Sequence, residues 1–312
     1  MKPKILITDT LFITKADEQK MLDAGFEIER IEDPGMDNVL LREALKDKTG
    51  YIIGGTESVT DEVIESADNL KVITFTGADW AHFIPGHELA TKKGIRITNT
   101  PGTTMFAVAE FTLTLLLMML RRALELGGPG DAGFITTKSL ANSHIGIIGV
   151  GYIGTEMVRM LTALGAKVSY WDRNRNTSIE TQYNATYLTL DELFSQCDII
   201  SNHVSSQAGE IITGELINKT KEDVLFVNTG AGNTFNMDAL YDRIASKKAR
   251  AAFDVHGIKD VRFDELPLSD WYATNDNGGF NTRQMLDKTN EMAVSSIINA
   301  LKTGTDEHVV NL

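Results

Sequence analysis

The sequence contains a single cysteine, Cys197, among 312 residues. One cysteine cannot form an internal disulfide, which excludes a disulfide-stapled secreted domain. Residues 1–11 do not form a basic and then apolar leader, so we expect a cytoplasmic protein. The longest apolar run, residues 111–120, is about half of what a membrane-spanning helix needs, and threonines interrupt it. We therefore expect a buried helix there and no membrane partner.

Basic residues are scarce as well. Lys and Arg number 30 against 43 Asp and Glu, which gives a net charge of −13. Such a field repels nucleic acids and anionic membrane surfaces. The six histidines are scattered, and Cys197 has no partner at ligand spacing, so we expect no metal site. No GxSxG elbow or Walker loop is present, which leaves hydrolase and nucleotide kinase activities without support.

The length and composition, with 42% hydrophobic and 23% charged residues, fit two globular domains. The N-terminal part alternates short β-type runs with helical patterns. Strands are expected at residues 4–7, 50–53, 71–75 and 95–98, and helices at about 15–24 and 60–66. Strands that alternate with helices indicate an α/β fold with a parallel sheet.

The second part repeats this alternation. Pro101-Gly102 ends the first set of strands, and residues 103–122 predict a long helix with apolar residues around most of its circumference. After a glycine-rich break at 127–130, strands are expected at 145–149, 167–171, 198–203, 224–228 and 250–255. This is the outline of a doubly wound domain. A last helix at 282–301 that returned to the first domain would make that domain discontinuous.

An apolar strand then runs into a GxGxxG motif formed by Gly149, Gly151 and Gly154. Gly149 permits a tight turn, Gly151 lets backbone amides approach a pyrophosphate, and Gly154 lets the following helix pack on the strand. Asp172 ends the next strand about 20 residues later, where a carboxylate binds ribose hydroxyls and repels a 2′-phosphate. These residues predict NAD as the cofactor. The adjacent Arg173 leaves NADP as an alternative.

Four further segments carry a family resemblance. They are Ile97-Thr98-Asn99-Thr100-Pro101-Gly102 with Ala107-Val108-Ala109-Glu110, Ser201-Asn202-His203-Val204, Val227-Asn228-Thr229 and Phe253-Asp254-Val255. Together they resemble the D-isomer-specific 2-hydroxyacid dehydrogenases over nearly the whole chain. The resemblance implies two doubly wound parallel-sheet domains. A Rossmann-type NAD-binding domain, 101–284, would be inserted in a flavodoxin-like substrate domain, 1–100 plus 285–312. It also implies a homodimer and a small-molecule substrate.

Positions that match the family imply the contacts of the cofactor and the substrate. The pyrophosphate contacts would be Gly149, Gly151, Tyr152, Ile153 and Gly154, and those of the adenosine ribose would be Asp172 and Arg173. The nicotinamide side would be lined by His203, Val204, Thr229, Gly230 and Gly278, with Asp254 at the carboxamide. A substrate loop would contain Thr76, Gly77, Asp79 and Trp80. Trp80 there suits an apolar or aromatic-stacking substrate, or it packs at the rim of the site.

The three catalytic side chains of the family do not match. Ala231 stands where the family has the arginine that clamps a 2-oxo acid, Lys259 where it has a glutamate, and Asp276 where it has the acid-base histidine. Without a bidentate arginine, ordinary 2-oxo acids should bind poorly. A free aspartate is too acidic for proton transfer near neutrality unless burial raises its pKa. The chain is thus expected to be a divergent member.

Two interpretations of this divergence remain open. Lys259 and Asp276 would form an ion pair that favours a cationic or hydroxyl-bearing substrate, or they are two unrelated surface charges. In an active dehydrogenase, Asp276, His256 or water would carry the proton, although His256 also fits a solvated loop. The alternative function is a non-catalytic NAD(H) sensor or scaffold.

Overall fold

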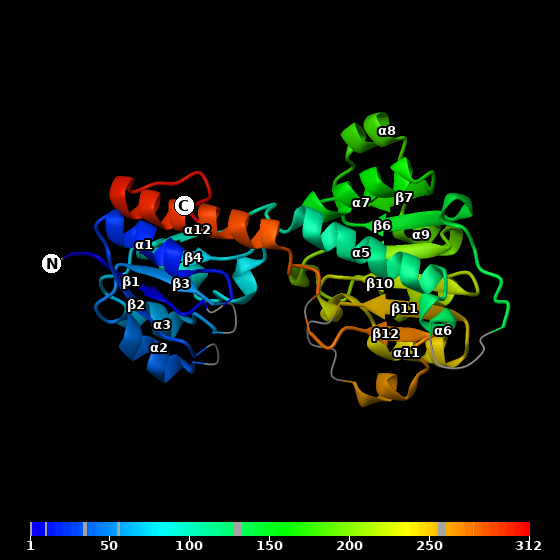
Figure 1. Ribbon diagram of the computed structural model, residues 1–312, viewed down its shortest axis with the longest axis horizontal. Coiled ribbons are helices and arrows are strands. Elements are labelled where there is room, and N and C mark those ends of the chain that lie inside the picture. Colours follow the sequence, from blue (N-terminus) through cyan, green and yellow to red (C-terminus); the bar gives the residue numbers. More distant parts are fainter. Residues whose placement is uncertain are drawn as a thin grey trace. The chain divides into compact units, whose positions relative to one another are not determined.

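The structure, a computed structural model, describes residues 2–9, 11–33, 36–54, 57–127, 133–254, 260–276 and 278–312. The chain divides into two compact units. Unit 1 comprises Met1–Thr104 and Thr282–Leu312, and unit 2 comprises Met105–Asn281. Each unit is built on its own parallel sheet (Figure 1). The expected α/β fold with two doubly wound domains is thus confirmed.

Unit 1 has a five-stranded sheet in the order β2-β1-β3-β4-β5. Its strands are β1 (Lys4–Ile7), β2 (Glu27–Arg30), β3 (Gly50–Ile53), β4 (Val72–Phe75) and β5 (Arg96–Thr98). Its helices are α1 (Lys15–Asp23), α2 (Asn38–Leu45), α3 (Asp61–Ser66), α4 (His87–Lys92) and α12 (Arg283–Thr303), with a 3-10 turn at Trp80–His82. This strand order is that of flavodoxin-like folds.

Helices cover both faces of the unit 1 sheet, because alternate strand residues point to opposite sides. One face buries Ile5, Ile7, Ile52 and Val72 with Met21 of α1 and Ala293, Val294, Ile297 and Ala300 of α12. The other buries Leu6, Tyr51, Ile53 and Ile73 with residues of α2, α3 and α4. Burial on both sides explains why the central strands are continuous apolar runs.

Unit 2 has a seven-stranded sheet in the order β12-β11-β10-β9-β6-β7-β8. Its strands are β6 (His144–Ile148), β7 (Lys167–Trp171), β8 (Thr186–Tyr187), β9 (Ile199–Asn202), β10 (Val224–Asn228), β11 (Ala249–Phe253) and β12 (Trp271–Ala273). Strand β6 pairs with β7 on one side and with β9 on the other. The strand order reverses between β6 and β9, and ligands of such sheets bind there, at the carboxyl ends of the strands.

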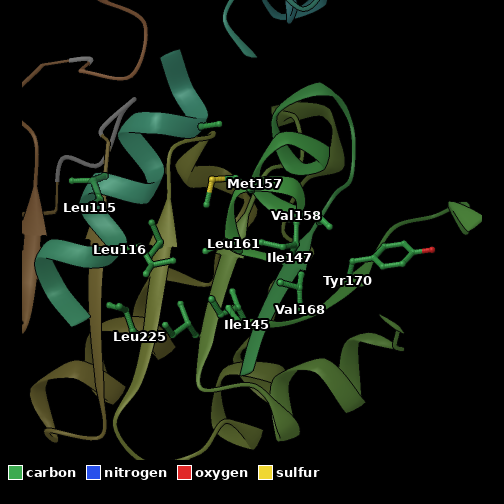
Figure 2. Close-up of a cluster of buried hydrophobic side chains, with 14 of the residues drawn as sticks. Leu115, Leu116, Ile145, Ile147, Met157, Val158, Leu161, Val168, Tyr170 and Leu225 are labelled. Carbon is green, nitrogen blue, oxygen red and sulfur yellow. The ribbon is translucent and has the colours of Figure 1, made fainter. Parts of the chain in front are cut away.

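The helices of unit 2 are α5 (Met105–Leu120), α6 (Ala123–Leu126), α7 (Tyr152–Ala163), α8 (Thr177–Tyr183), α9 (Leu190–Gln196), α10 (Gly214–Lys219) and α11 (Met237–Ala245). Figure 2 shows the core on one face of the sheet, where Leu115 and Leu116 of α5 and Met157, Val158 and Leu161 of α7 surround Ile145, Ile147, Val168 and Leu225. This packing fixes the start of α7 against the end of β6. Helix α5 is the apolar helix expected from the sequence. Within the described residues, no helix is long and apolar enough to cross a membrane.

Several elements were not expected from the sequence. Strand β2 has the sequence Glu-Ile-Glu-Arg and lies at the edge of its sheet, partly exposed. Strand β12 is a three-residue strand at the edge of the other sheet. Edge strands are often charged, as β2 is, or very short, as β12 is, and either feature weakens the apolar signal on which sequence patterns depend.

Candidate functional site

The glycine loop of unit 2 is shaped by two close approaches. Gly149 has φ +86°, and a Cβ there would lie 2.8 Å from Val204 Cγ1 and 3.1 Å from the His203 carbonyl oxygen. A Cβ on Gly154 would lie 1.9 Å from the carbonyl oxygen of Gly149. The first position requires a left-handed turn, and the second lets α7 pack directly against the loop. Neither position accommodates another residue.

Gly151 is different because its α-carbon faces open space. A Cβ built there meets nothing within 4 Å, and Gly151 is the N-cap of α7 without a side-chain cap. A pocket of about 370 Å³ lies at this point, lined by Met105, Gly151, Tyr152, Thr155 and Glu156. Uncapped amides at the start of a helix form an anion site. The arrangement fits the pyrophosphate of a dinucleotide.

Asp172 lies at the end of β7, beside this loop. Its Oδ2 accepts a hydrogen bond from the Val150 amide at 2.7 Å, and the Gly149 amide donates to the Trp171 carbonyl at 2.8 Å. The Asp172 carboxylate is therefore hydrogen-bonded to the glycine loop. Asp172 is partly exposed. Arg173 is exposed. Arg175 is engaged by Glu180, at 2.7 Å, and lies over the Tyr187 ring.

His203 and Val204 follow β9 and contact the glycine loop at Gly149. The His203 Nε2 atom lies 2.9 Å from Ser201 Oγ. Burial lowers the pKa of His203 to about 3, so the imidazole is neutral near pH 7. A neutral, partly buried ring beside the glycine loop suits a packing role. The surroundings of His203 therefore do not indicate a catalytic role for it.

The lowered pKa of the partly buried His203 makes the stability of the protein depend on pH. In the unfolded chain His203 titrates near its ordinary pKa of about 6.5, so the unfolded state binds more protons between about pH 6.5 and 3. Stability attributable to His203 therefore falls as the pH is lowered through this range, by at most about 1.4 kcal/mol per pH unit. We expect His203→Asn to flatten this part of the profile of Tm against pH. The exposed His82→Asn serves as the control, and a His203→Asn profile parallel to the wild type would contradict the assignment.

The loop after β10 is held by buried amides. Asn228 Oδ1 accepts hydrogen bonds from the Gly230 amide at 3.1 Å and from Asn202 Nδ2 at 3.0 Å. Thr234 Oγ1 donates to the Ala231 carbonyl at 2.7 Å. These hydrogen bonds hold the loop that carries Ala231. Asn202, Asn228 and Thr234 were not identified from the sequence as supports of this loop.

Asp254 anchors a second loop at the same edge of the sheet. Its carboxylate is buried and accepts hydrogen bonds from Thr274 Oγ1 at 2.7 Å and from the amides of Gly278 and Gly279, both at 2.9 Å. Asp254 thereby fixes the segment that carries Asp276. Asp276 itself is exposed. His256 and Lys259 lie outside the described residues, so their interpretations, including the Lys259–Asp276 ion pair, stay predictions.

The predicted substrate loop lies in unit 1, after β4. Thr76 Oγ1 donates to Asp9 Oδ2 at 2.6 Å, and a Cβ on Gly77 would lie 2.6 Å from the Phe75 ring. Asp79 precedes the 3-10 turn, and Trp80 packs edge-on against His87 with ring centroids 5.3 Å apart. The Trp80 contact favours rim packing over an open stacking surface.

Asp9 was not singled out from the sequence. It is fully buried after β1, and its Oδ1 accepts hydrogen bonds from the amides of Leu11, Phe12 and Ile13. Burial raises the pKa of this carboxyl. Asp9 therefore joins the loops that follow β1 and β4. An aspartate two residues after an apolar strand is the sequence signal that points to such a turn.

Metal and thiol chemistry find no support in the described ranges. No group of three or more His, Cys, Asp or Glu side chains there could hold a metal ion. Cys197 is buried under β6, and burial raises the pKa of its thiol to about 12. The thiol is therefore a packing group.

Comparison with known proteins agrees with the geometry of unit 2. The family model described as D-isomer specific 2-hydroxyacid dehydrogenase, NAD binding domain, matches residues 114–272. A glyoxylate reductase of Thermofilum pendens is 30% identical over 288 residues, which cover 86% of this chain and 82% of the relative. A hydroxypyruvate reductase of Thermotoga maritima is 33% identical over 235 residues, covering 72% and 75%.

Solved structures share the fold of the whole chain. A Pyrococcus horikoshii protein has a TM-score of 0.80 at 28% identity and covers 100% of this chain and 96% of its own. The NAD⁺-bound 3-phosphoglycerate dehydrogenase of Entamoeba histolytica has a TM-score of 0.83 at 22% identity, covering 100% and 99%. The chain belongs to the D-isomer specific 2-hydroxyacid dehydrogenase family, and NAD is the cofactor of its unit 2.

Proposed function

We propose that this protein is an NAD-dependent oxidoreductase that interconverts a hydroxyl and a carbonyl group on a small substrate. The observation that carries the proposal is the uncapped start of α7 at Gly151, which opens on a pocket in a chain of this family. Bound NAD would accept or supply the hydride. The amides of Tyr152 and Ile153 would hold its pyrophosphate, and Asp172 its adenosine ribose.

The substrate is proposed to differ from an ordinary 2-oxo acid. Ala231 offers no cation for a substrate carboxylate, and the loop around it is held by uncharged side chains that include Asn202, Asn228 and Thr234. Asp276 stands at the family's histidine position on a loop anchored by Asp254. A carboxylate at the reacting end favours a substrate that carries hydroxyl or amino groups. Asp276, His256 or water would move the proton.

The substitutions at these positions also support a second candidate function. A protein that binds NAD(H) without turnover, as a redox sensor or scaffold, needs the glycine loop and Asp172 but none of the catalytic side chains. Ala231 and the exposed Asp276 are compatible with such a protein. The two functions differ in whether NADH is consumed.

A panel assay separates the two functions. Purified protein is mixed with NADH and with oxo acids, aldehydes, hydroxyketones or aminoketones, and the loss of NADH absorbance is followed. We expect turnover with a hydroxyl- or amino-bearing carbonyl compound and poor turnover with simple 2-oxo acids. Tight NADH binding without turnover of any compound would favour the sensor.

The role of Asp276 is tested with the substrate found in this way. Asp276→Asn should lower kcat by about tenfold or more, because a group that moves a proton contributes at least that much, and should leave the Kd for NADH unchanged. The matched control is Asp242→Asn, which changes an exposed carboxylate of α11. Unaltered kinetics in Asp276→Asn would show that the proton moves through another group.

We also propose that the protein is a cytoplasmic homodimer that pairs through unit 2. Phe134 is 98% exposed and Leu126 is 52% exposed, and both lie in the part of unit 2 between α5 and β6. Apolar side chains with such large exposed fractions suit a surface that a second subunit covers. Light scattering of the purified protein should give twice the mass of the chain, and a monomer mass would contradict the proposal.

A further inference from the structure

Two threonine hydroxyls meet where α5 packs against the end of β10. Thr112 lies in α5 and is fully buried, whereas Thr229 directly follows β10 and is partly buried. Their Oγ1 atoms are 2.7 Å apart. Thr112 Oγ1 also lies 2.7 Å from the carbonyl oxygen of Val108, one helical turn earlier. The three groups form a short hydrogen-bonded chain that ends at the proposed nicotinamide side of the site.

The number of available protons determines which group is the donor in each of these hydrogen bonds. A threonine hydroxyl has one proton to donate, and a carbonyl oxygen has none. The Thr112 proton must therefore lie on the bond to Val108, which is a common arrangement for a threonine inside a helix. The bond between the two hydroxyls must then use the proton of Thr229. Toward any further group, Thr229 Oγ1 has only lone pairs and acts as an acceptor.

The position of Thr229 on the sheet indicates which group it would accept from. If Asp172 at the end of β7 binds the adenosine ribose, the nicotinamide half of NAD would lie on the other side of the switch point, over the ends of β9 and β10. The carboxamide of nicotinamide carries an N–H donor. Asp254, which the family resemblance places at the carboxamide, already accepts hydrogen bonds from Thr274, Gly278 and Gly279, and Thr229 would provide a second acceptor there.

We propose that Thr112 is a positioning residue that makes Thr229 an obligate acceptor for the carboxamide N–H of NAD. The inference rests on the proposed function, since it concerns the cofactor of the same site. Thr112 acts only through Thr229 and contacts no reacting atom. Without the Thr112 hydroxyl, the Thr229 proton is released from its bond. Thr229 can then donate as well as accept, and the selectivity for an N–H group is lost.

The test compares two dinucleotides by calorimetry on the full-length protein. The probes are NAD⁺ and 3-acetylpyridine adenine dinucleotide, in which an acetyl group replaces the carboxamide and offers no N–H. The wild type should bind NAD⁺ more tightly by about five- to tenfold, the worth of one neutral hydrogen bond. Thr112→Val, which keeps the shape but lacks the hydroxyl, should lower this ratio several-fold. Thr112→Ser keeps the hydroxyl and should retain the wild-type ratio.

Two results would overturn the inference. The first is that Thr112→Val weakens the binding of both dinucleotides by the same factor, which would indicate a merely structural role. The second is that Thr112→Val leaves both affinities unchanged. If the buried Thr112→Val does not fold, Thr229→Val provides the same test at a partly exposed position. It should lower the affinity for NAD⁺ and not that for the analogue, and an equal loss for both contradicts the inference. If the wild type turns over a compound of the substrate panel but binds NAD⁺ and the analogue equally well, this inference is rejected and the proposed function is not.

Discussion

Replacing Gly154 with alanine should abolish NAD binding and destabilise unit 2. The new Cβ would lie 1.9 Å from the carbonyl oxygen of Gly149, which belongs to the backbone and cannot move aside as a side chain does. Helix α7 would have to shift away from β6, out of the core that Figure 2 shows. We expect a loss of about 3 kcal/mol or more in the free energy of unfolding. Urea denaturation and calorimetry with NADH measure the two effects.

Gly151→Ala is the matched control for this prediction. A Cβ at Gly151 meets nothing within 4 Å and the backbone has φ −69°, so alanine fits the folded chain. Its free energy of unfolding should stay within about 0.5 kcal/mol of the wild type. The same Cβ would stand where the pyrophosphate approaches the amides, so the affinity for NADH should fall by about tenfold or more. Equal stabilities of Gly151→Ala and Gly154→Ala would contradict our account of the loop.

Asp172→Asn should shift the choice of cofactor toward NADPH. The wild-type carboxylate repels a 2′-phosphate, whereas asparagine keeps an oxygen that can accept from the Val150 amide but carries no charge. We expect the preference for NADH over NADPH, measured as a ratio of Kd values, to fall by about tenfold or more. The loop itself should stay intact, because the bond to Val150 is retained.

Asp172→Ala separates the two roles of this side chain. Alanine removes both the charge and the acceptor for Val150, so NADH affinity should fall further than in Asp172→Asn, with lower thermal stability. A wild-type protein that prefers NADPH, or an unchanged ratio in Asp172→Asn, would disprove the electrostatic account of NAD selection.

The part of the site that could be predicted from sequence is the part that is local in sequence. Gly149, Gly151, Gly154 and Asp172 belong to one strand-turn-helix-strand unit, and each glycine has a distinct steric signature. The spacing of these residues therefore predicts both the turn and the carboxylate beside it. The structure adds a second reason for Gly149 beyond its positive φ, because Val204, which follows β9, leaves no room for a Cβ at this position.

The contacts that support the nicotinamide side could not be predicted in this way. Thr112 and Thr229 come together only because α5 packs on β10, and 117 residues separate them. In the sequence, Thr112 is merely a polar interruption of an apolar helix. The same holds for Asn202, whose bond to Asn228 depends on the pairing of β9 with β10. Neither packing nor pairing register follows from a single sequence.

The two parts of unit 1 are far apart in the sequence, and this affects when unit 1 can fold during synthesis. Ile5, Ile7, Ile52 and Val72 form a face that is completed by α12, and the ribosome makes that helix only after all of unit 2. Unit 2 is one continuous segment and can fold as soon as it emerges. Until α12 is synthesised, the nascent N-terminal sheet has an uncovered apolar side, which a chaperone can bind. The first segment to leave the ribosome is therefore the last to complete its core.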